Sequence, residues 1–196
     1  HYPLRRQRQM CIRDRYRAAP GQLVIELDPG MAFGTGQHST TRLCLVALER
    51  RLRPGMAVLD LGTGSGILAI AAAKLGAGSV LALDINPLAV KIARGNVQAN
   101  GVAGVVRVEP GTLPLKETWQ GSFDLVVCNI TAEVIGELAD HLLRAAKPWG
   151  TVVVSGFITE HVDGVVARLG EAGAVAIEVL AEGEWRGVVA QAQREG

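Results

Sequence analysis

The chain has 196 residues, of which 48% are hydrophobic and 20% charged, and its formal net charge is +1. This balance is typical of one well-packed globular domain and excludes a disordered polymer. A net charge so close to zero gives no general attraction to nucleic acid or to a membrane surface. No apolar run approaches the ~20 residues that a membrane span needs. We therefore expect a cytoplasmic, monomeric domain without direct nucleic-acid binding or membrane attachment.

The first fifteen residues differ from the rest of the sequence. Residues 1–15 are rich in arginine and have no apolar period, so we expect a tail outside the fold rather than a nucleic-acid-binding arm. Residues 16–196 are expected to form one domain. Cys11, Cys44 and Cys128 lack metal-ligand spacing, which predicts reduced, mostly buried thiols and no metal site.

The first predicted elements precede a glycine-rich motif. Residues 22–28 alternate apolar and polar side chains, which predicts a short strand or an extended lead-in. A glycine-rich loop follows up to His38. Ser39 or a neighbouring threonine is expected to cap a helix that runs to about Leu52, where Arg53-Pro54-Gly55 stops it.

From residue 57 onward, apolar strands alternate with helices. Strands are expected at 57–61, 79–84, 105–109, 123–129, 151–155, 175–180 and 185–192, and helices at 67–75, 87–101, 133–146 and 160–172. Continuous Val, Leu, Ile and Ala runs in the first five strands indicate a parallel sheet that is covered on both faces. Right-handed crossovers then predict a doubly wound, Rossmann-like α/β sheet of seven mostly parallel strands, with the last two forming an antiparallel hairpin at one edge.

The segment 58–67 carries the strongest functional signal. An apolar strand runs into glycines at positions 62, 64 and 66 and then into a helix. Glycines let a ligand lie against the backbone, and the N-terminus of the new helix points its free N–H groups toward that ligand. The next strand ends in Asp84, whose carboxylate can accept both hydroxyls of a ribose. Together these features predict a site for an adenosine-containing cofactor.

The spacing of the glycines distinguishes between cofactors. A dinucleotide fingerprint, G-x-G-x-x-G, requires glycine at the position where this chain has Ile67. The G-x-G-x-G form is instead the usual variant in S-adenosylmethionine (AdoMet) methyltransferases, in which no pyrophosphate has to be held. A nicotinamide-dependent oxidoreductase is the competing enzyme hypothesis. A tight strand-to-helix turn that binds no ligand is the purely structural alternative.

A longer stretch of the sequence resembles a known family. Residues 27–41 read L-D-P-G-M-A-F-G-T-G-Q-H-S-T-T. This segment resembles the L-D-P-G-x-A-F-G-T-G-x-H-x-T-T signature of the ribosomal protein L-eleven methyltransferases, the PrmA family. The resemblance continues through 60–69, 84–87, 123–132 and 183–185, and it covers nearly everything from residue 16 onward.

The resemblance implies a class I AdoMet-dependent methyltransferase domain that modifies lysine side chains and the α-amino group of a large-subunit ribosomal protein. Family members carry a separate substrate-recognition domain before the glycine-rich loop, and we expect this chain to be the catalytic domain without it. Two alternatives stay open. One is a module that binds AdoMet without activity, and the other is a methyltransferase that acts on a different protein.

Candidate site residues follow from the same comparison. The resemblance implies four AdoMet contacts: Thr41, Gly62, Asp84 and Asn129. Two further candidates are Gly64 in the glycine turn and Phe33 in the preceding lid-like loop. Each of the four also makes physical sense. The glycine admits the backbone, the carboxylate takes the ribose, the asparagine ends a strand at the ligand edge of the sheet, and the threonine offers a hydroxyl.

Asn129 is also the predicted catalytic residue. It begins the segment 129–132, Asn-Ile-Thr-Ala, at the position where amide and adenine methyltransferases carry N-P-P-Y. Its side-chain carbonyl can accept an N–H from the incoming amine, and the absence of an aromatic platform in this segment disfavours flat substrates. His38 is a candidate general base, although a role in bracing the loop is the favoured interpretation. The tryptophans are interpreted as packing or edge residues: Trp119, Trp149 and Trp185.

Overall fold

The computed structural model of the chain describes residues 23–27, 38–114 and 119–193. The predictions for residues 1–15, for Cys11 and for Phe33 lie outside these described residues.

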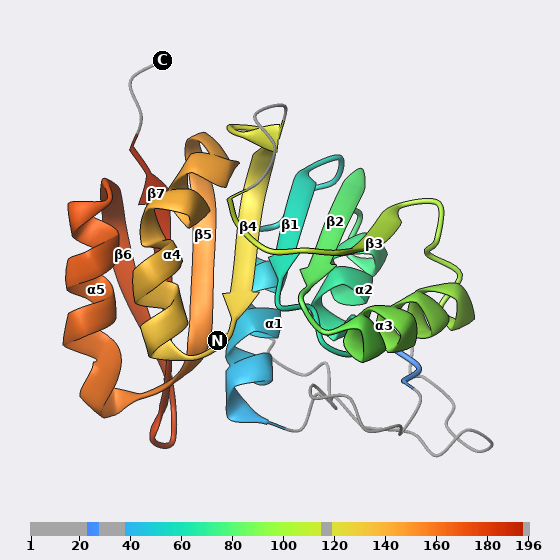
Figure 1. Cartoon of the computed structure of the whole chain (residues 1–196), viewed down its shortest axis with the longest axis horizontal. Helices are drawn as coiled ribbons and strands as arrows, with labels where there is room; N and C mark the ends of the chain where they lie inside the picture. Colours follow the sequence, from blue (N-terminus) through green and yellow to red (C-terminus); the bar gives the residue numbers. More distant parts are fainter. Residues whose placement is uncertain (1–22, 28–37, 115–118, 194–196) are drawn as a thin grey trace, which may run out of the picture.

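The described residues form a seven-stranded sheet at the centre of the domain (Figure 1). Its strands are β1 Ala57–Leu61, β2 Ser79–Asp84, β3 Val106–Pro110, β4 Phe123–Asn129, β5 Ala146–Ile158, β6 Ala174–Glu182 and β7 Trp185–Ala192. The strand order is β3-β2-β1-β4-β5-β7-β6, in which β1 to β5 run parallel. Strand β7 pairs antiparallel with both β5 and the edge strand β6. The predicted mostly parallel sheet with an antiparallel edge hairpin is therefore confirmed.

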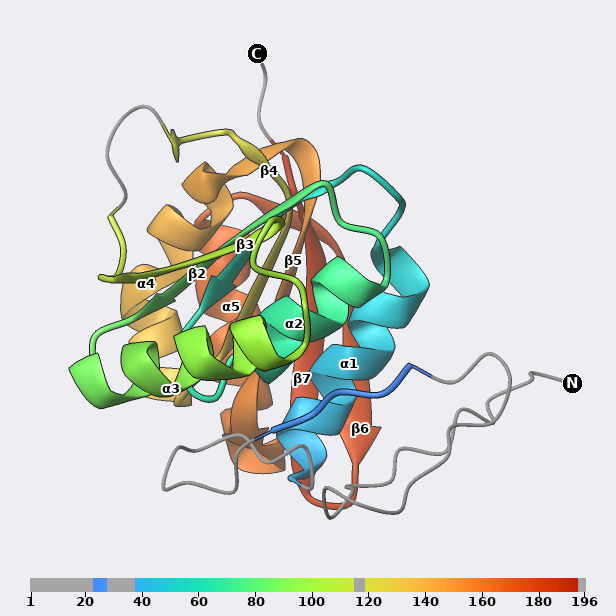
Figure 2. The same ribbon diagram turned by 90° about the vertical axis from the view of Figure 1, so that its right-hand side faces the viewer.

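Helices cover both faces of this sheet (Figure 2). They are α1 Ser39–Arg51, α2 Ile67–Lys74, α3 Pro87–Ala99, α4 Ala132–Ala145, the 3-10 turn η2 Thr159–His161, and α5 Val162–Glu171. Helices α1, α2 and α3 share one apolar cluster with the sheet, and α4 and α5 share the other. Within β1, Val58 belongs to the first cluster and Leu59 to the second, and both are fully buried. Burial on both faces explains why the strand is apolar throughout.

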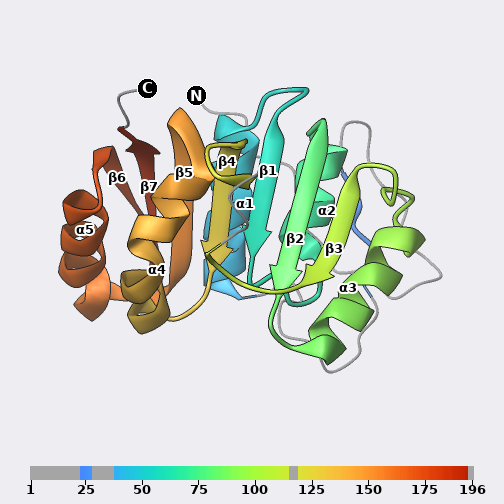
Figure 3. The same cartoon turned by 45° about the horizontal axis from the view of Figure 1, so that its top comes forward.

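The carboxyl ends of β1, β2 and β4 meet at one edge of the sheet (Figure 3). This is the edge at which doubly wound sheets hold their ligands. No helix in the described part of the chain is long and apolar enough to cross a bilayer.

Helices α1 and α3 each begin at a residue whose side chain accepts a backbone N–H of the first turn. Asn86 caps α3 as predicted, because its Oδ1 accepts the Leu88 N–H at 2.9 Å, and proline follows at the first helical position. The prediction for α1 was wrong by one residue. The cap is His38, whose Nδ1 accepts the Thr40 N–H at 3.4 Å, whereas Ser39 is already helical. The extended backbone at His38 brings its ring over the first turn.

Strand β5 is longer than the predicted 151–155. It begins at Ala146, directly after α4, and the sequence Pro148-Trp149-Gly150 that was expected to lie between helix and strand is part of it. Ala146 pairs with Phe123 and Thr151 with Leu125, so a bulge absorbs the intervening residues. Trp149 takes a φ of 62° within this bulge. The strand also extends to Ile158 at its other end, because it continues to pair with β7 there.

Residues 23–27 form no strand, which leaves the extended lead-in of the two predicted alternatives. The segment is fixed by one side chain from α2 and one from the residue that follows α3. Lys74 Nζ donates to the Val24 carbonyl at 2.6 Å, and Asn100 exchanges hydrogen bonds with the Glu26 backbone at 3.0 and 2.6 Å. Ile25 and Leu27 pack against the α1–α3 side of the core.

Cys44 and Cys128 are fully buried free thiols, as predicted. Burial raises the pKa of both thiols, and the neighbouring Asp60 carboxyl adds to this effect. Neither thiol is therefore primed for nucleophilic chemistry.

Candidate active site

A cavity of about 500 Å³ lies at the carboxyl edge of the sheet. This size falls within the range of about 300–1,000 Å³ that is usual for small-molecule sites. The structure brings five of the six candidate residues to its wall: Thr41, Gly62, Gly64, Asp84 and Asn129. They come from α1, the turn after β1, the end of β2 and the end of β4, so the topology gathers positions that are far apart in the sequence.

The turn after β1 places bare backbone on the cavity wall. Gly62, Gly64 and Gly66 have φ values of 73°, 55° and 85°, a left-handed region that side chains rarely adopt. A Cβ on Gly62 would lie 2.6 Å from Ile130 Cγ2, so the turn also packs too closely against the segment after β4 for any other residue. The Leu83 carbonyl accepts the N–H groups of Gly62 and Thr63 at 2.9 and 3.0 Å, which ties the turn to β2.

Asp84 holds two backbone groups at the rim of the cavity. Its Oδ2 accepts the Gly64 N–H at 2.9 Å, and its Oδ1 accepts the Asn86 N–H at 2.9 Å. These bonds fix the carboxylate between the glycine turn and the start of α3. Each carboxylate oxygen has two lone pairs, so both retain the capacity to accept a further hydroxyl.

Asp60 is a buried residue that supports the cavity wall without lining it, and sequence reasoning missed it. It is fully buried below the glycine turn, and its Oδ2 accepts Thr63 Oγ1 at 2.6 Å and the Ala69 N–H at 3.1 Å. Its Oδ1 has no hydrogen-bond partner among the described residues. Burial raises the pKa of Asp60 to about 6, although the bonds from Thr63 and Ala69 act in the opposite direction. Asp60 thus joins the turn to the first turn of α2.

We expect this carboxyl to make stability depend on pH. Its pKa rises from 3.8 to about 6 on folding, so between these values the native state binds more protons than the unfolded chain. The stabilisation from this group is therefore largest below the lower value and is lost as the pH rises through the upper one, by up to roughly 3 kcal/mol. In Asp60→Asn the amide oxygen can still accept both bonds, and this pH dependence should disappear.

Urea unfolding of both proteins at about pH 4.5 and about pH 7 measures the difference. A change in the free energy of unfolding between the two pH values that is the same in wild type and in Asp60→Asn would contradict the prediction. It would show that Asp60 is ionised in the native state at both pH values.

Asn129 and Thr41 meet across the cavity wall. Asn129 Nδ2 donates to Thr41 Oγ1 at 3.4 Å, and Thr41 is 1% exposed. Because its NH₂ group is engaged in this way, the amide can offer its carbonyl oxygen to a ligand. His38 lies 2.8 Å from Thr40 Oγ1 through Nδ1 and caps α1, whereas the loop that it was expected to brace lies outside the described residues.

Trp185 was predicted as a packing or edge residue, and the structure also places it on the cavity wall. It lines the cavity and meets the His38 ring edge-on, with centroids 4.4 Å apart. The family resemblance at 183–185 was the available signal for this residue. By contrast, Trp119 stacks on Phe123 with centroids 6.0 Å apart, as a packing residue should. Ile85 was also missed: it lines the cavity next to Asp84 and is 75% exposed, so it offers an apolar surface at the rim.

A second cavity of about 850 Å³ adjoins the first, between α4 and α5. Three residues line both cavities: Thr131, Gly156 and Trp185. In residues 23–27, 38–114 and 119–193, no group of three or more His, Cys, Asp or Glu side chains is arranged to hold a metal ion.

The sheet order, the glycine turn after the first strand and the carboxylate that ends the second define the Rossmann-like fold of the class I AdoMet-dependent methyltransferases. A precorrin-6y C5,15-methyltransferase from Geobacter metallireducens shares this fold, with a TM-score of 0.66 at 18% identity over 80% of this chain and 90% of that chain.

The chain belongs to the family described as "Ribosomal protein L11 methyltransferase (PrmA)", which matches residues 1–193. A protein named ribosomal protein L11 methyltransferase from Pelotomaculum thermopropionicum is 49% identical over 192 residues, which are 96% of this chain and 62% of that protein. A protein of the same name from Chloroflexus aurantiacus is 47% identical over 89% of this chain and 60% of its own length. The chain thus spans about three fifths of the length of these curated relatives.

The crystal structure of a ribosomal protein L11 methylase from Lactobacillus delbrueckii subsp. bulgaricus superimposes with a TM-score of 0.79 at 35% identity. The match covers 92% of this chain and 91% of that chain. The predicted family and fold are both confirmed.

Proposed function

We propose that this chain binds AdoMet in the 500 Å³ cavity and transfers its methyl group to lysine and α-amino groups of an L11-type ribosomal protein. It would do so in the cytoplasm, where ribosomes assemble, and as a monomer. One observation carries the proposal. In a member of this family, the glycine turn, Asp84 and Asn129 converge on a single cavity at the ligand edge of the sheet.

The residues present fit this cofactor. The two oxygens of Asp84, already oriented by Gly64 and Asn86, can accept the ribose hydroxyls. Ile85 next to them offers an exposed apolar surface for the purine ring. Gly62 lies on the cavity wall and carries no side chain, so its bare backbone leaves room for the methionine portion. The ribose, the purine and the methionine portion of AdoMet would therefore each face a residue of suitable chemistry.

The chemistry asks the protein mainly to position an amine. Bound AdoMet supplies a methyl carbon on a sulfonium, which the lone pair of a neutral amine attacks in line. Holding the two groups in that geometry can lower the barrier by roughly 7–11 kcal/mol. Deprotonating a lysine with pKa ~10.4 costs about 4–5 kcal/mol near neutral pH, and desolvation at the cavity reduces this cost. Asn129 can accept an amine N–H and so direct the lone pair.

Transfer of tritiated methyl from AdoMet to an L11-type ribosomal protein tests the proposal. Incorporation into lysine and the N-terminus is expected. Tight AdoMet binding by calorimetry without incorporation would favour the binding module, and incorporation only into other proteins would favour a different substrate. Binding of a nicotinamide dinucleotide in place of AdoMet would favour the oxidoreductase.

We expect Asn129→Ala to lower kcat by roughly 100-fold, because the acceptor that orients the amine is lost at the reacting centre. Thr41→Val removes the hydroxyl that holds Asn129 Nδ2 and should lower kcat by only about fivefold. Single-turnover rates and AdoMet affinity, measured on both variants, separate catalysis from cofactor binding. A wild-type kcat in Asn129→Ala would remove this residue from the reaction.

A further inference from the structure

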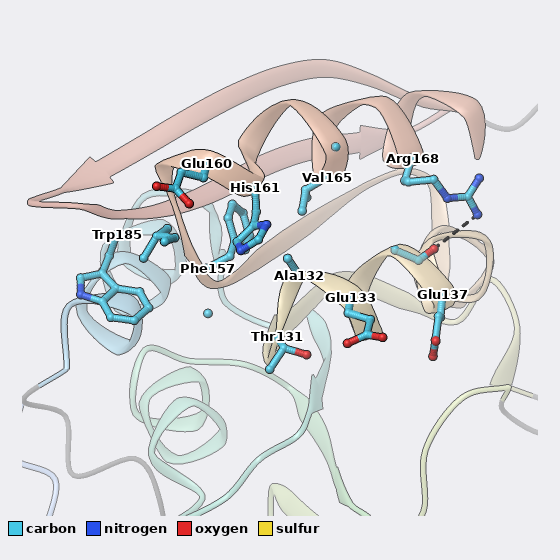
Figure 4. A pocket seen from close by; sticks show the side chains of 14 residues that line it. Thr131, Ala132, Glu133, Glu137, Phe157, Glu160, His161, Val165, Arg168 and Trp185 are labelled. Carbon is cyan, nitrogen blue, oxygen red and sulfur yellow. Dashed lines mark hydrogen bonds between the residues drawn. The ribbon is translucent and has the colours of Figure 1, made fainter.

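The cavity between α4 and α5 forms a groove, whose lining side chains are shown in Figure 4. Its walls are the first half of α4, the end of β5, η2 and α5. Because Thr131, Gly156 and Trp185 also line the 500 Å³ cavity, the groove joins it close to Asn129. A polypeptide lying in the groove would therefore bring its side chains to the reacting centre.

The charges of the groove favour a cationic occupant. Glu133 and Glu137 line it from α4 and Glu160 from η2, and all three are exposed. None of the salt bridges within the described residues uses these carboxylates. The arginine of the groove, Arg168, is already paired with Glu171 at 2.6 Å and donates to the Gly136 carbonyl at 3.3 Å. His161 completes the titratable groups of the lining.

The shape of the groove suits an extended chain with long side chains. Its floor includes Phe157 and Val165, which are 2% and 3% exposed. Gly164 keeps one wall low, and a Cβ there would meet nothing within 4 Å. Glycine costs about 1 kcal/mol in a helix interior, and no packing contact requires it at position 164. What the absent side chain provides is open space on this side of the groove. Lysine stems can lie on such a floor while their ammonium groups reach the glutamates.

Resting on the proposed function, we propose that the groove between α4 and α5 binds the lysine-rich polypeptide segment that carries the target amine. Glu133, Glu137 and Glu160 pair with lysines that flank this amine, and the amine itself passes Trp185 toward Asn129. The groove thereby selects substrates by the positive charge around the methylated residue.

The test uses a fluorescein-labelled peptide of alternating lysine and alanine with a free α-amine. Its binding is followed by fluorescence anisotropy, and its methylation by tritium transfer. Glu133→Gln, Glu137→Gln and Glu160→Gln are combined in one triple variant. We expect this variant to raise both Kd and KM for the peptide by roughly tenfold at low salt, with kcat and AdoMet affinity unchanged. The difference should shrink in about 0.5 M salt, where exposed charges are screened.

Two further variants separate charge from shape. Asp163→Asn removes a carboxylate from α5 that does not line the groove, so it should leave both constants unchanged. Gly164→Leu places a side chain in the groove without a backbone clash, so it should raise KM equally at low and high salt. Circular dichroism confirms that each variant is folded.

The outcomes distinguish this inference from the proposed function. Methyl transfer by the wild type with no change of Kd or KM in the triple variant would overturn the groove proposal and leave the methyltransferase intact. Peptide binding that weakens in the triple variant, without any methyl transfer by the wild type, would keep the groove and overturn the activity. Failure of the wild-type chain to bind the peptide also overturns the groove.

Discussion

Replacing Asp84 by alanine is expected to weaken AdoMet binding by about 10- to 100-fold. The ribose hydroxyls would lose the charge-assisted hydrogen bonds that they donate to this carboxylate. Bonds of this kind contribute about 1.5–3 kcal/mol. The change also releases the Gly64 and Asn86 N–H groups, which Asp84 holds at 2.9 Å each, so the glycine turn loses one of its ties. Isothermal titration with AdoMet measures the affinity directly.

Asp84→Asn serves as the matched control, because it keeps one acceptor oxygen and the size of the side chain. Its affinity should lie between those of wild type and Asp84→Ala. Urea unfolding of all three proteins shows how much of the loss comes from a loosened turn. An unchanged affinity in Asp84→Ala would place the ribose elsewhere and remove the main polar contact of the proposed site.

Gly156→Ala is expected to be the most destabilising single methyl addition near the active site, by roughly 3–5 kcal/mol. Gly156 has a φ of 111°, and its Cβ would lie 2.0 Å from the Ile130 carbonyl oxygen and 2.9 Å from the Ile130 nitrogen. Both neighbours are backbone atoms that cannot rotate away. The end of β5 would have to move from the segment that follows Asn129, so the wall shared by the two cavities would open.

Gly55→Ala isolates the conformational part of this cost. Gly55 has a comparable positive φ of 85°, but its Cβ would meet nothing within 4 Å. It should lose only about 1–2 kcal/mol. Urea unfolding of the two variants gives the comparison, and equal losses would mean that β5 does not approach Ile130 as closely as described.

Much of the fold could be predicted because both faces of the sheet are buried. Strands such as β1 then read as continuous apolar runs, and the turns between them carry glycine or proline. The start of β5 could not be read in this way. Pro148, Trp149 and Gly150 have the local chemistry of a loop, and they belong to the strand because the residues on either side of their bulge, Ala146 and Thr151, pair with β4. His38 was missed as a cap because an imidazole is an uncommon acceptor there.

In the candidate site, too, residues with a role set by local sequence could be predicted, and residues with a role set by distant contacts could not. Gly62 and Asp84 were predictable because their roles depend on a short motif and on the next strand end. Asp60 was not, since its role depends on burial beneath α2 rather than on spacing. Trp185 was assigned to packing because nothing local connects it to residues 129–131, and only the place of β7 beside β5 brings it to the cavity.

The insertion of β7 between β5 and β6 also bears on the order of synthesis. Until residues 185–192 have left the ribosome, β5 exposes an unpaired edge and Trp185 is missing from both cavities. Unpaired edges invite association with other chains, and long-range pairings form slowly. The nascent domain would thus carry its glycine turn and Asp84 before Trp185 is in place, and the wall shared by the two cavities would be complete only once β7 has paired with β5.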